Sequence, residues 1–513
     1  MPVRSRPTAV ERCGALREKR AEPGGTREAT GLYTDVPEDR RAGSNAAMRC
    51  LSLSVIVLPV PTSAASSAST RDPARSPRRA GIGFWGLVAL TFFTVSGGAY
   101  GLEPVIGGVG AVAGLALIIL IPIFWSLPTA LAVGEMSAMY PLRGGYFHWV
   151  RIALGDFWGF LEGWWSWMFT FVDMALYPVL CGDILAQIWP LLTGHTLNSL
   201  ARIGFILGFI WLAALINAAG ARWVAGYSLF AMVVVLAPFV AFILSAWLRA
   251  HPHAGAISTP VKLVHGGWGL ALAAVLWNYT GWDNVATFAP QVQRPERTYP
   301  RALLATLGLI VVAYVVPVLA GLHLNPVTAD WSDGYFVRLG ALAWGPWLSL
   351  TMAITAVLSA WAQYTSQVLY VMQLPVELAA AGYLPRALAR ADAREVPWRA
   401  LWLSTLLYSL FALASFGRLL VADLLLYFAG LSLEFIALLV LRRRSPQTPR
   451  PFRAARSWPG LILICLSPLL VGGISVYFSA RHSPAFAAIG VALLFTGPVW
   501  FFLVRRRSKF ISA

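Results

Sequence analysis

The run that decides the fold of this chain is VSGGAYGLEP, residues 95–104. It lies inside an apolar segment, residues 83–106, that is long enough to cross a membrane as one helix. Three glycines and a proline in this run disfavour a continuous helix. Backbone groups freed by such a break are costly in hydrocarbon unless they line a cavity, so the break indicates a binding site. The alternative, a glycine surface for close helix packing, accounts less well for the carboxylate of Glu103.

A second interruption, WNYTGWDN at residues 277–284, lies within another apolar segment, residues 267–289. Its Asp283 is an ionisable group inside a predicted span, which by default indicates function. The same carboxylate can also cap the N-terminus of a half-helix, and the two roles are compatible. The interrupted segments come first and sixth in the chain, so they occupy corresponding positions of two five-helix halves. That placement is typical of an inverted repeat whose site lies between the breaks.

The composition indicates a polytopic membrane protein. Of the 513 residues, 58% are hydrophobic and 12% are charged, and the mean hydropathy is +0.65. Soluble domains carry about 25% charged residues, so a soluble or largely disordered chain is excluded. Apolar runs of ~20 residues also exclude a β-barrel, whose strands span ~10 residues. We predict an all-α fold with twelve transmembrane helices at residues 83–106, 111–133, 155–189, 201–219, 223–248, 267–289, 302–323, 343–374, 399–416, 420–441, 458–479 and 485–504.

The basic residues set the predicted orientation. The net charge of +17 by itself suggests an acidic partner such as nucleic acid, but Lys and Arg gather in the loops on one side, for example 294–301 and 442–456. We therefore interpret them as topology anchors, with both termini cytoplasmic and no nucleic-acid partner. The expected location is the plasma membrane, or the inner membrane if the cell is bacterial. Residues 1–80 are predicted to be a disordered basic tail and residues 506–513 a basic cytoplasmic end.

An ordered set of further motifs accompanies the two interruptions. It includes FWGF at 157–160, EGWW at 162–165, ALYPVL at 175–180, GYLP at 382–385 and RPFR at 450–453. Together with SGGAYGLE at 96–103, this set resembles the amino acid–polyamine–organocation (APC) superfamily. The likeness is strongest to the branch of plant polyamine uptake transporters and related bacterial permeases, and it covers roughly residues 84–505.

The resemblance implies a LeuT-like fold, a 5+5 inverted repeat followed by two helices, that works by alternating access. It places a transporter domain over residues 81–505, with the first repeat at 81–248, the second at 267–441 and the last two helices at 458–504. The implied activity is that of a secondary active transporter importing polyamines or amino acids. A general or cationic amino acid permease and a non-transporting nutrient sensor on the same fold remain alternatives.

Acidic residues inside the predicted spans point to a cationic cargo. Asp173 falls near the middle of the membrane, and Glu162 lies eleven residues earlier on the same helical face. Glu103, Asp173 and Asp283 together can surround a cavity in which aromatic rings add cation–π contacts. The amides of the first glycine pair would instead suit the carboxylate of an amino acid. We predict as substrate-binding residues Ser96, Gly97, Gly98, Tyr100, Glu103, Asp173, Tyr177, Trp277, Asn278, Tyr279, Gly281 and Asp283.

The coupling ion is predicted to be a proton rather than sodium. Asp173, Asp283 and Glu434 are the candidate carriers, because many proton-coupled relatives use a lysine of the fifth span and residues 223–248 contain none. Sodium would need oxygens from the first and eighth spans. The seven histidines form no i, i+4 pair and the four cysteines lack metal-like spacing. We therefore expect no enzyme activity, catalytic residue, metal or cofactor.

Overall fold

Helices account for nearly all of the described chain. The computed structural model describes residues 81–249, 267–287, 289–392, 396–413 and 416–511. Within these residues there is no strand, and Ile82 and Val292 form one isolated bridge. The predicted tail, residues 1–80, lies outside the described residues, as do residues 512–513 of the predicted basic end.

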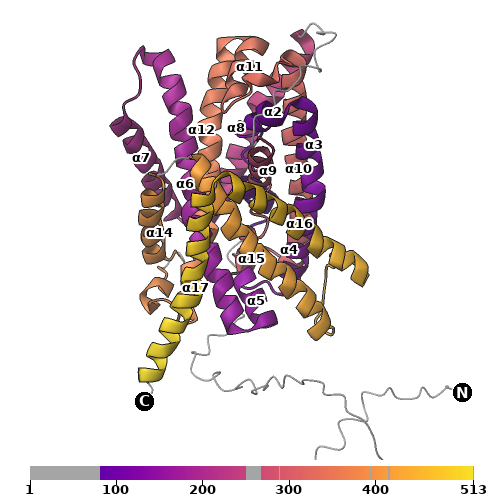
Figure 1. Ribbon diagram of the computed structural model, residues 1–513, viewed down its shortest axis with the longest axis vertical. Coiled ribbons are helices and arrows are strands. Elements are labelled where there is room, and N and C mark those ends of the chain that lie inside the picture. The colour runs from indigo at the N-terminus through magenta and orange to yellow at the C-terminus, as the bar shows by residue number, and fades with distance from the viewer. Residues whose placement is uncertain (1–80, 250–266, 288, 393–395, 414–415, 512–513) are drawn as a thin grey trace, which may run out of the picture. The chain divides into compact units, whose positions relative to one another are not determined.

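Many of the long helices, such as α6, α8, α10 and α12, run roughly along the long axis of the bundle, and α15 and α16 cross it obliquely (Figure 1). The α-helices are α1 (Phe84–Val95), α2 (Glu103–Val109), α3 (Ala111–Ile121), α4 (Leu127–Met139), α5 (Tyr146–Leu154), α6 (Asp156–Thr193), α7 (Ser199–Asn217), α8 (Ala221–Arg249), α9 (Gly267–Trp277), α10 (Pro295–Leu324), α11 (Tyr335–Trp344), α12 (Pro346–Val371), α13 (Gln373–Ala380), α14 (Trp398–Phe411), α15 (Phe416–Arg444), α16 (Trp458–His482) and α17 (Pro484–Ile511). A π-helical turn, Pro122–Ser126, joins α3 to α4, and short 3₁₀ turns lie at Asn284–Thr287, Ala289–Gln291, Thr328–Asp330 and Arg386–Ala389.

Eight helical segments of the described chain are long and apolar enough to cross a membrane. They are residues 111–139, 156–186, 199–217, 223–248, 295–324, 421–444, 458–481 and 484–505, and each overlaps one predicted span. Of the other four predicted spans, the first contains the short apolar helix α1 and the start of α2, and the sixth contains the short apolar helix α9. The eighth contains α12, which is long but polar in its second half, and the ninth contains the 14-residue α14.

Several predicted boundaries are wrong. The second span continues to Met139 rather than residue 133, and the seventh begins at Pro295 rather than residue 302. The predicted span 343–374 joins the end of one helix to the next, because α11 ends before Gly345 and α12 starts at Pro346. Gly345 has a φ of 86°, and a proline cannot donate the hydrogen bond that would continue α11.

Both interruptions lie where the sequence predicts them. α1 ends at Val95 because Ser96 is extended, with φ −142° and ψ 148°. Gly98 and Gly101 then adopt φ values of 88°, which side chains disfavour, and α2 begins at Glu103. After α9, Gly281 has a φ of 99°, and the 3₁₀ turn Asn284–Thr287 follows.

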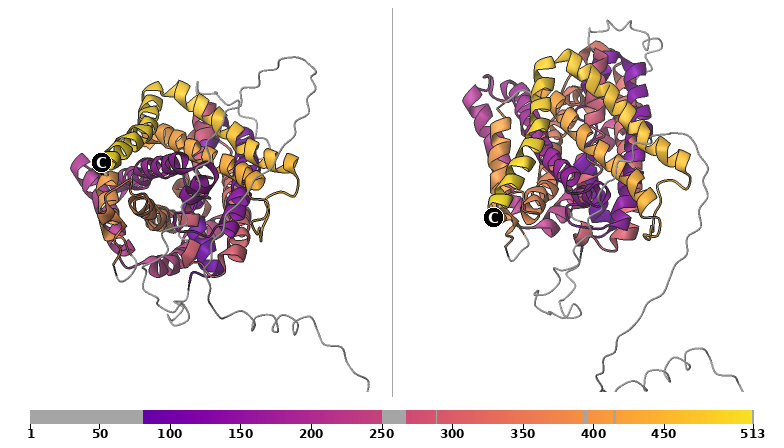
Figure 2. Two further views of the ribbon diagram at one scale, coloured as in Figure 1. Left: turned by 90° about the horizontal axis from the view of Figure 1, so that it is seen from below. Right: turned by 60° about the horizontal axis from the view of Figure 1, so that its bottom comes forward.

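α6 lies inside the bundle, and other helices cover it. Most residues of its apolar membrane-length segment are buried, and it packs against α5, α12 and α15. By contrast, α7, α16 and α17 are mostly exposed along their apolar segments, as expected for helices that face lipid. Figure 2 shows α16 and α17, in yellow, at the periphery. The polar side chains of α6 can therefore line an internal site.

Candidate functional site

Within the first interruption, backbone N–H groups are hydrogen-bonded by side chains of the same segment. The Gly101 N–H donates to Glu103 Oε2 over 2.7 Å, and the Gly98 N–H donates to Ser96 Oγ over 3.1 Å. Glu103 is fully buried at the N-terminus of α2, and its Oε1 has no hydrogen-bond partner among the residues that the structure describes. One carboxylate oxygen of Glu103 thus stabilises the turn, and the other is an acceptor without a hydrogen bond within the described residues.

Gly97 packs directly against α12. Ser359 Oγ donates a hydrogen bond to the Gly97 carbonyl. A Cβ atom at Gly97 would collide with Ser359 Oγ and with the Gln363 side chain, whose Cδ would be 2.7 Å away. Glycine is required here because the broken segment and α12 approach closely.

The two interruptions lie side by side. A Cβ atom on Gly281 would sit 2.8 Å from the Thr94 carbonyl oxygen. Asn278 Nδ2 donates to the Gly101 carbonyl over 3.5 Å, and the Tyr314 hydroxyl donates to the Asn278 carbonyl over 2.8 Å. The sequence predicts that both breaks border one region, and the structure brings them together.

Asp173 of α6 is the centre of a buried polar network. Trp277 Nε1 donates to Asp173 Oδ1 over 3.2 Å, and the Tyr177 hydroxyl donates to the same oxygen over 3.4 Å. Gln367 of α12 donates in turn to the Tyr177 hydroxyl, and Tyr370 donates to Gln367. The Tyr177 and Trp277 rings lie 5.7 Å apart. Three predicted site residues, from α6 and α9, therefore meet.

Asp283 accepts a hydrogen bond from α15. The Tyr427 hydroxyl donates to Asp283 Oδ1 over 2.6 Å and accepts the Gly281 N–H over 3.1 Å. Asp283 is 3% exposed, and the charges that act most strongly on the buried carboxyl of Glu434 are those of Asp283 and Glu162. The second interruption and α15 thus share one polar region.

Two of the predicted site residues, Tyr100 and Tyr279, direct their hydroxyl groups away from Asp173 and Asp283. The Tyr100 hydroxyl is bonded to α12, donating to the Met352 carbonyl over 2.8 Å and lying 3.0 Å from Thr355 Oγ1. The Tyr279 hydroxyl donates to the Ile118 carbonyl of α3 over 3.0 Å, so its ring faces α3 rather than Asp173. The structure brings neither hydroxyl to the acids of the network.

Two residues of the region were missed by sequence reasoning, namely Asp423 and Tyr427. Asp423 is fully buried, neither of its carboxylate oxygens has a hydrogen-bond partner in the described part of the chain, and it lies close enough to Asp173 for the two carboxyl groups to interact electrostatically. An acid inside the predicted span 420–441 was a readable signal by the same rule that selected Asp173. Tyr427 carried no such signal, because a tyrosine in an apolar helix is ordinary.

The buried acids fall into two kinds. Glu135 of α4 is neutralised by Arg442, at 2.5 Å, and by Arg450, at 3.3 Å. Six others are at most 3% exposed and form no ion pair within the described residues; they are Glu103, Glu162, Asp173, Asp283, Asp423 and Glu434. An isolated buried carboxylate is strongly disfavoured, so such groups hold protons or neutralise a bound cation.

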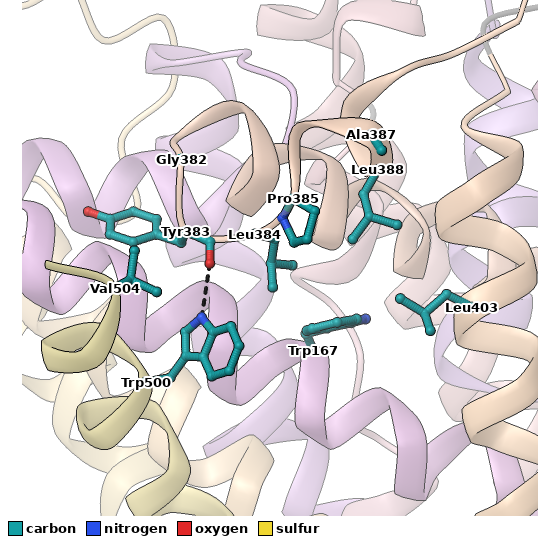
Figure 3. Close-up of a pocket in the computed structure, with 10 residues that line it drawn as sticks. All are labelled: Trp167, Gly382, Tyr383, Leu384, Pro385, Ala387, Leu388, Leu403, Trp500 and Val504. Atoms are coloured by element: carbon teal, nitrogen blue, oxygen red, sulfur yellow. Dashed lines mark hydrogen bonds between the residues drawn. The ribbon is translucent and has the colours of Figure 1, made fainter. Parts of the chain in front are cut away.

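A pocket of about 500 Å³ lies away from these acids (Figure 3). It is bordered by α6, α14, α17 and the segment after α13, and Trp500 Nε1 donates to the Tyr383 carbonyl at its edge. Its lining residues are Trp167, Gly382, Tyr383, Leu384, Pro385, Ala387, Leu388, Leu403, Trp500 and Val504. None of them is charged, so this pocket offers no counter-charge to a cation.

Comparison with known proteins agrees with the predicted resemblance. Residues 82–505 match the family model described as amino acid permease. The polyamine transporter RMV1 of Arabidopsis thaliana is 32% identical over 437 residues, covering 83% of this chain and 88% of the relative. The polyamine transporter PUT1 of Oryza sativa subsp. japonica is 32% identical over 383 residues, covering 74% and 71%.

A bacterial relative is more distant. The uncharacterized transporter Rv1999c of Mycobacterium tuberculosis is 28% identical over 306 residues, covering 57% of this chain and 63% of the relative. The family match and the plant relatives span most of the chain, and the eight apolar helices fit a multi-pass protein of the membrane. The chain therefore belongs to the amino acid permease family, within the APC superfamily of membrane transporters.

Proposed function

We propose that this protein is a secondary active transporter that imports organic amines, with polyamines as the preferred cargo, by alternating access coupled to protons. The observation that carries the proposal is the pair of buried acids Asp173 and Asp423. Neither has a basic partner among the described residues, and the rings of Tyr177 and Trp277 stand beside Asp173. An ammonium group would supply the missing charge and the cation–π contact at once. The names of the plant relatives support the same cargo class.

The proposed binding residues are those of the two adjoining breaks and of α6. Asp173, Tyr177 and Trp277 would contact the ammonium, and Ser96, Gly97, Gly98, Asn278 and Gly281 would form the backbone wall. Glu103 and Asp283 would add negative charge from the two sides, while Tyr100 and Tyr279 would support the wall from behind. Asp173, Asp283 and Glu434 are the proposed proton carriers, since a carboxyl without a basic partner can exchange a proton inside a membrane.

The proposed architecture has twelve spans. Residues 81–248 and 267–441 would form the inverted repeat, residues 458–504 would add two helices, and residues 1–80 and 506–513 would be cytoplasmic. The proposed location is the plasma membrane, or the inner membrane of a bacterium. Epitope tags at the two ends, probed in sealed cells and after permeabilisation, test this orientation. Access to either tag in sealed cells would contradict it.

A second candidate function is transport of amino acids. It would need backbone amides of the first break to bind the substrate carboxylate. One of these, the Gly98 N–H, already donates to Ser96 Oγ, which favours a cargo without a carboxylate. A nutrient sensor on the same fold is the third possibility, and it would bind amines without moving them.

The deciding experiment is uptake into proteoliposomes of one labelled polyamine, with a competition panel of polyamines and amino acids. Repeating it at two pH values, with and without sodium, tests the coupling ion. Competition by polyamines and acceleration by an imposed proton gradient are the expected results. Measurable binding without flux of any amine or amino acid would refute the transporter and favour the sensor.

A further inference from the structure

α6 and α15 carry matching polar stripes that face each other. In each helix the residues follow the spacing i, i+4, i+7 and i+11, which keeps them on one face. α6 presents Glu162, Ser166, Phe169 and Asp173, and α15 presents Asp423, Tyr427, Gly430 and Glu434. We call the contact between these eight residues the α6–α15 seam.

Across the seam, successive residues of α6 face residues of α15 in the reverse chain order. A Cβ atom on Gly430 would lie 3.1 Å from Glu162 Oε1, and the Phe169 and Tyr427 rings are 5.2 Å apart. At the far end, the charge of Asp173 acts on Asp423. The helices are therefore antiparallel, and the lack of a side chain at Gly430 leaves room for the Glu162 carboxyl.

Carboxyl groups collect at both ends of the seam. The Asp173 end holds Asp173 and Asp423, and the Glu162 end holds Glu162, Asp283 and Glu434. All five are at most 3% exposed. Among the described residues, both oxygens of Asp423 and Oε2 of Glu162 have no hydrogen-bond partner. These unpartnered acceptors, and the absence of ion pairs noted above, indicate that each end is built to receive a cation.

The spacing of the two ends matches a long amine better than a short one. Eleven helical residues advance by about 16 Å, and leaning side chains shorten that distance. An extended chain advances about 1.2 Å per bond, since three bonds per residue span at most ~3.6 Å. On that scale the terminal nitrogens of putrescine, five bonds apart, are about 6 Å apart. Those of spermidine and spermine, nine and thirteen bonds apart, reach about 11 and 16 Å.

We propose that the α6–α15 seam binds linear polyamines lengthwise, with one ammonium at each end, and so selects triamines and tetraamines over diamines. A diamine would engage only the Asp173 end. Phe169 and Tyr427 lie between the ends, where their rings can cover the methylene chain and an internal ammonium. This inference rests on the proposed function, and it adds Asp423 and Glu162 as residues that determine specificity.

The test compares kcat/KM for spermidine and putrescine uptake in proteoliposomes. Glu162→Gln is expected to lower the value for spermidine about ten-fold or more beyond the loss for putrescine, since one charge-assisted contact is lost. Asp173→Asn is expected to lower both values by similar factors. Asp183→Asn is the matched control, because this α6 carboxyl pairs with Arg202 outside the seam.

Calorimetric binding of the two amines to each purified variant separates recognition from turnover and shows that the variant is folded. A selective loss of spermidine affinity is expected from Glu162→Gln. Equal losses for both amines would overturn the proposal and assign Glu162 to a step common to every cargo, such as proton transfer. Failure of the wild-type protein to transport any amine would instead refute the proposed function.

Discussion

The substitution Gly97→Ala tests how closely the first interruption approaches α12. The added Cβ would overlap Gln363 and the Ser359 hydroxyl, so one of them must move. Overfilling a packed site costs about 1–3 kcal/mol, and the hydrogen bond from Ser359 to the Gly97 carbonyl adds ~1 kcal/mol if it is lost. We therefore expect the variant to lose about 2–4 kcal/mol of stability.

The assay is thermal unfolding of the purified protein in detergent, followed by tryptophan fluorescence, together with amine uptake. Gly308→Ala in α10 is the matched control, because its added Cβ would contact nothing within 4 Å. That control is expected to be neutral or to gain up to ~1 kcal/mol, since alanine is the better helix former. Gly97→Ala should melt several degrees lower and transport more slowly.

A double variant sharpens the test. Truncating the closest neighbour in Gly97→Ala/Gln363→Ala opens space for the new methyl group, so part of the lost stability should return. If Gly97→Ala melts and transports like the parent protein, the close approach between the interruption and α12 is wrong. If the double variant is no better than the single one, the crowding does not come from Gln363.

Four further substitutions probe the buried carboxyl groups. Asp173→Asn and Asp283→Asn are each expected to weaken uptake of cationic substrate at least ten-fold, measured with labelled spermidine. Tyr427→Phe removes the hydroxyl that donates to Asp283, which should cost about 1.5–3 kcal/mol of stability in a melting experiment. Arg442→Ala leaves Glu135 with one basic partner, so stability should fall by about 2–4 kcal/mol.

Each of these predictions would be contradicted by a definite result. If both aspartate variants keep wild-type uptake of putrescine, spermidine and arginine, the idea of an anionic cavity fails. A Tyr427→Phe variant with unchanged melting would mean that its hydroxyl adds no net stability. Arg443→Ala, at an exposed position next to Arg442, is the control for the ion-pair variant and should change little. An equal effect of both arginine variants would remove the special role of the Glu135 pair.

Local chemistry made the interruptions predictable. Gly98, Gly101 and Gly281 adopt positive φ values where the sequence places glycines inside apolar runs, and such breaks depend only on neighbouring residues. The division at Gly345-Pro346 is equally local. It was missed because the surrounding residues are apolar enough to be read as one span.

Contacts between distant helices were not predictable in the same way. Periodicity placed Glu162 and Asp173 on one face of α6, but it could not show that Asp423 stands opposite Asp173. Tyr279 illustrates the reverse case, since its place in the interruption suggested a site residue and its hydroxyl binds α3. Which residues of two helices face each other depends on their packing, and a single helix pattern does not contain that information.

The acids of α6 also affect how the chain enters the membrane. An acid at the centre of a lone helix makes insertion less favourable by ~2.5–3.5 kcal/mol, and α6 carries both Glu162 and Asp173. Its facing partner α15 is synthesised only after α7 to α14, tens of seconds later at ~5–20 residues per second. α6 must therefore be protected during biogenesis until α15 arrives. Chains truncated before α15 should be degraded faster than chains truncated after it, as a pulse-chase experiment can measure.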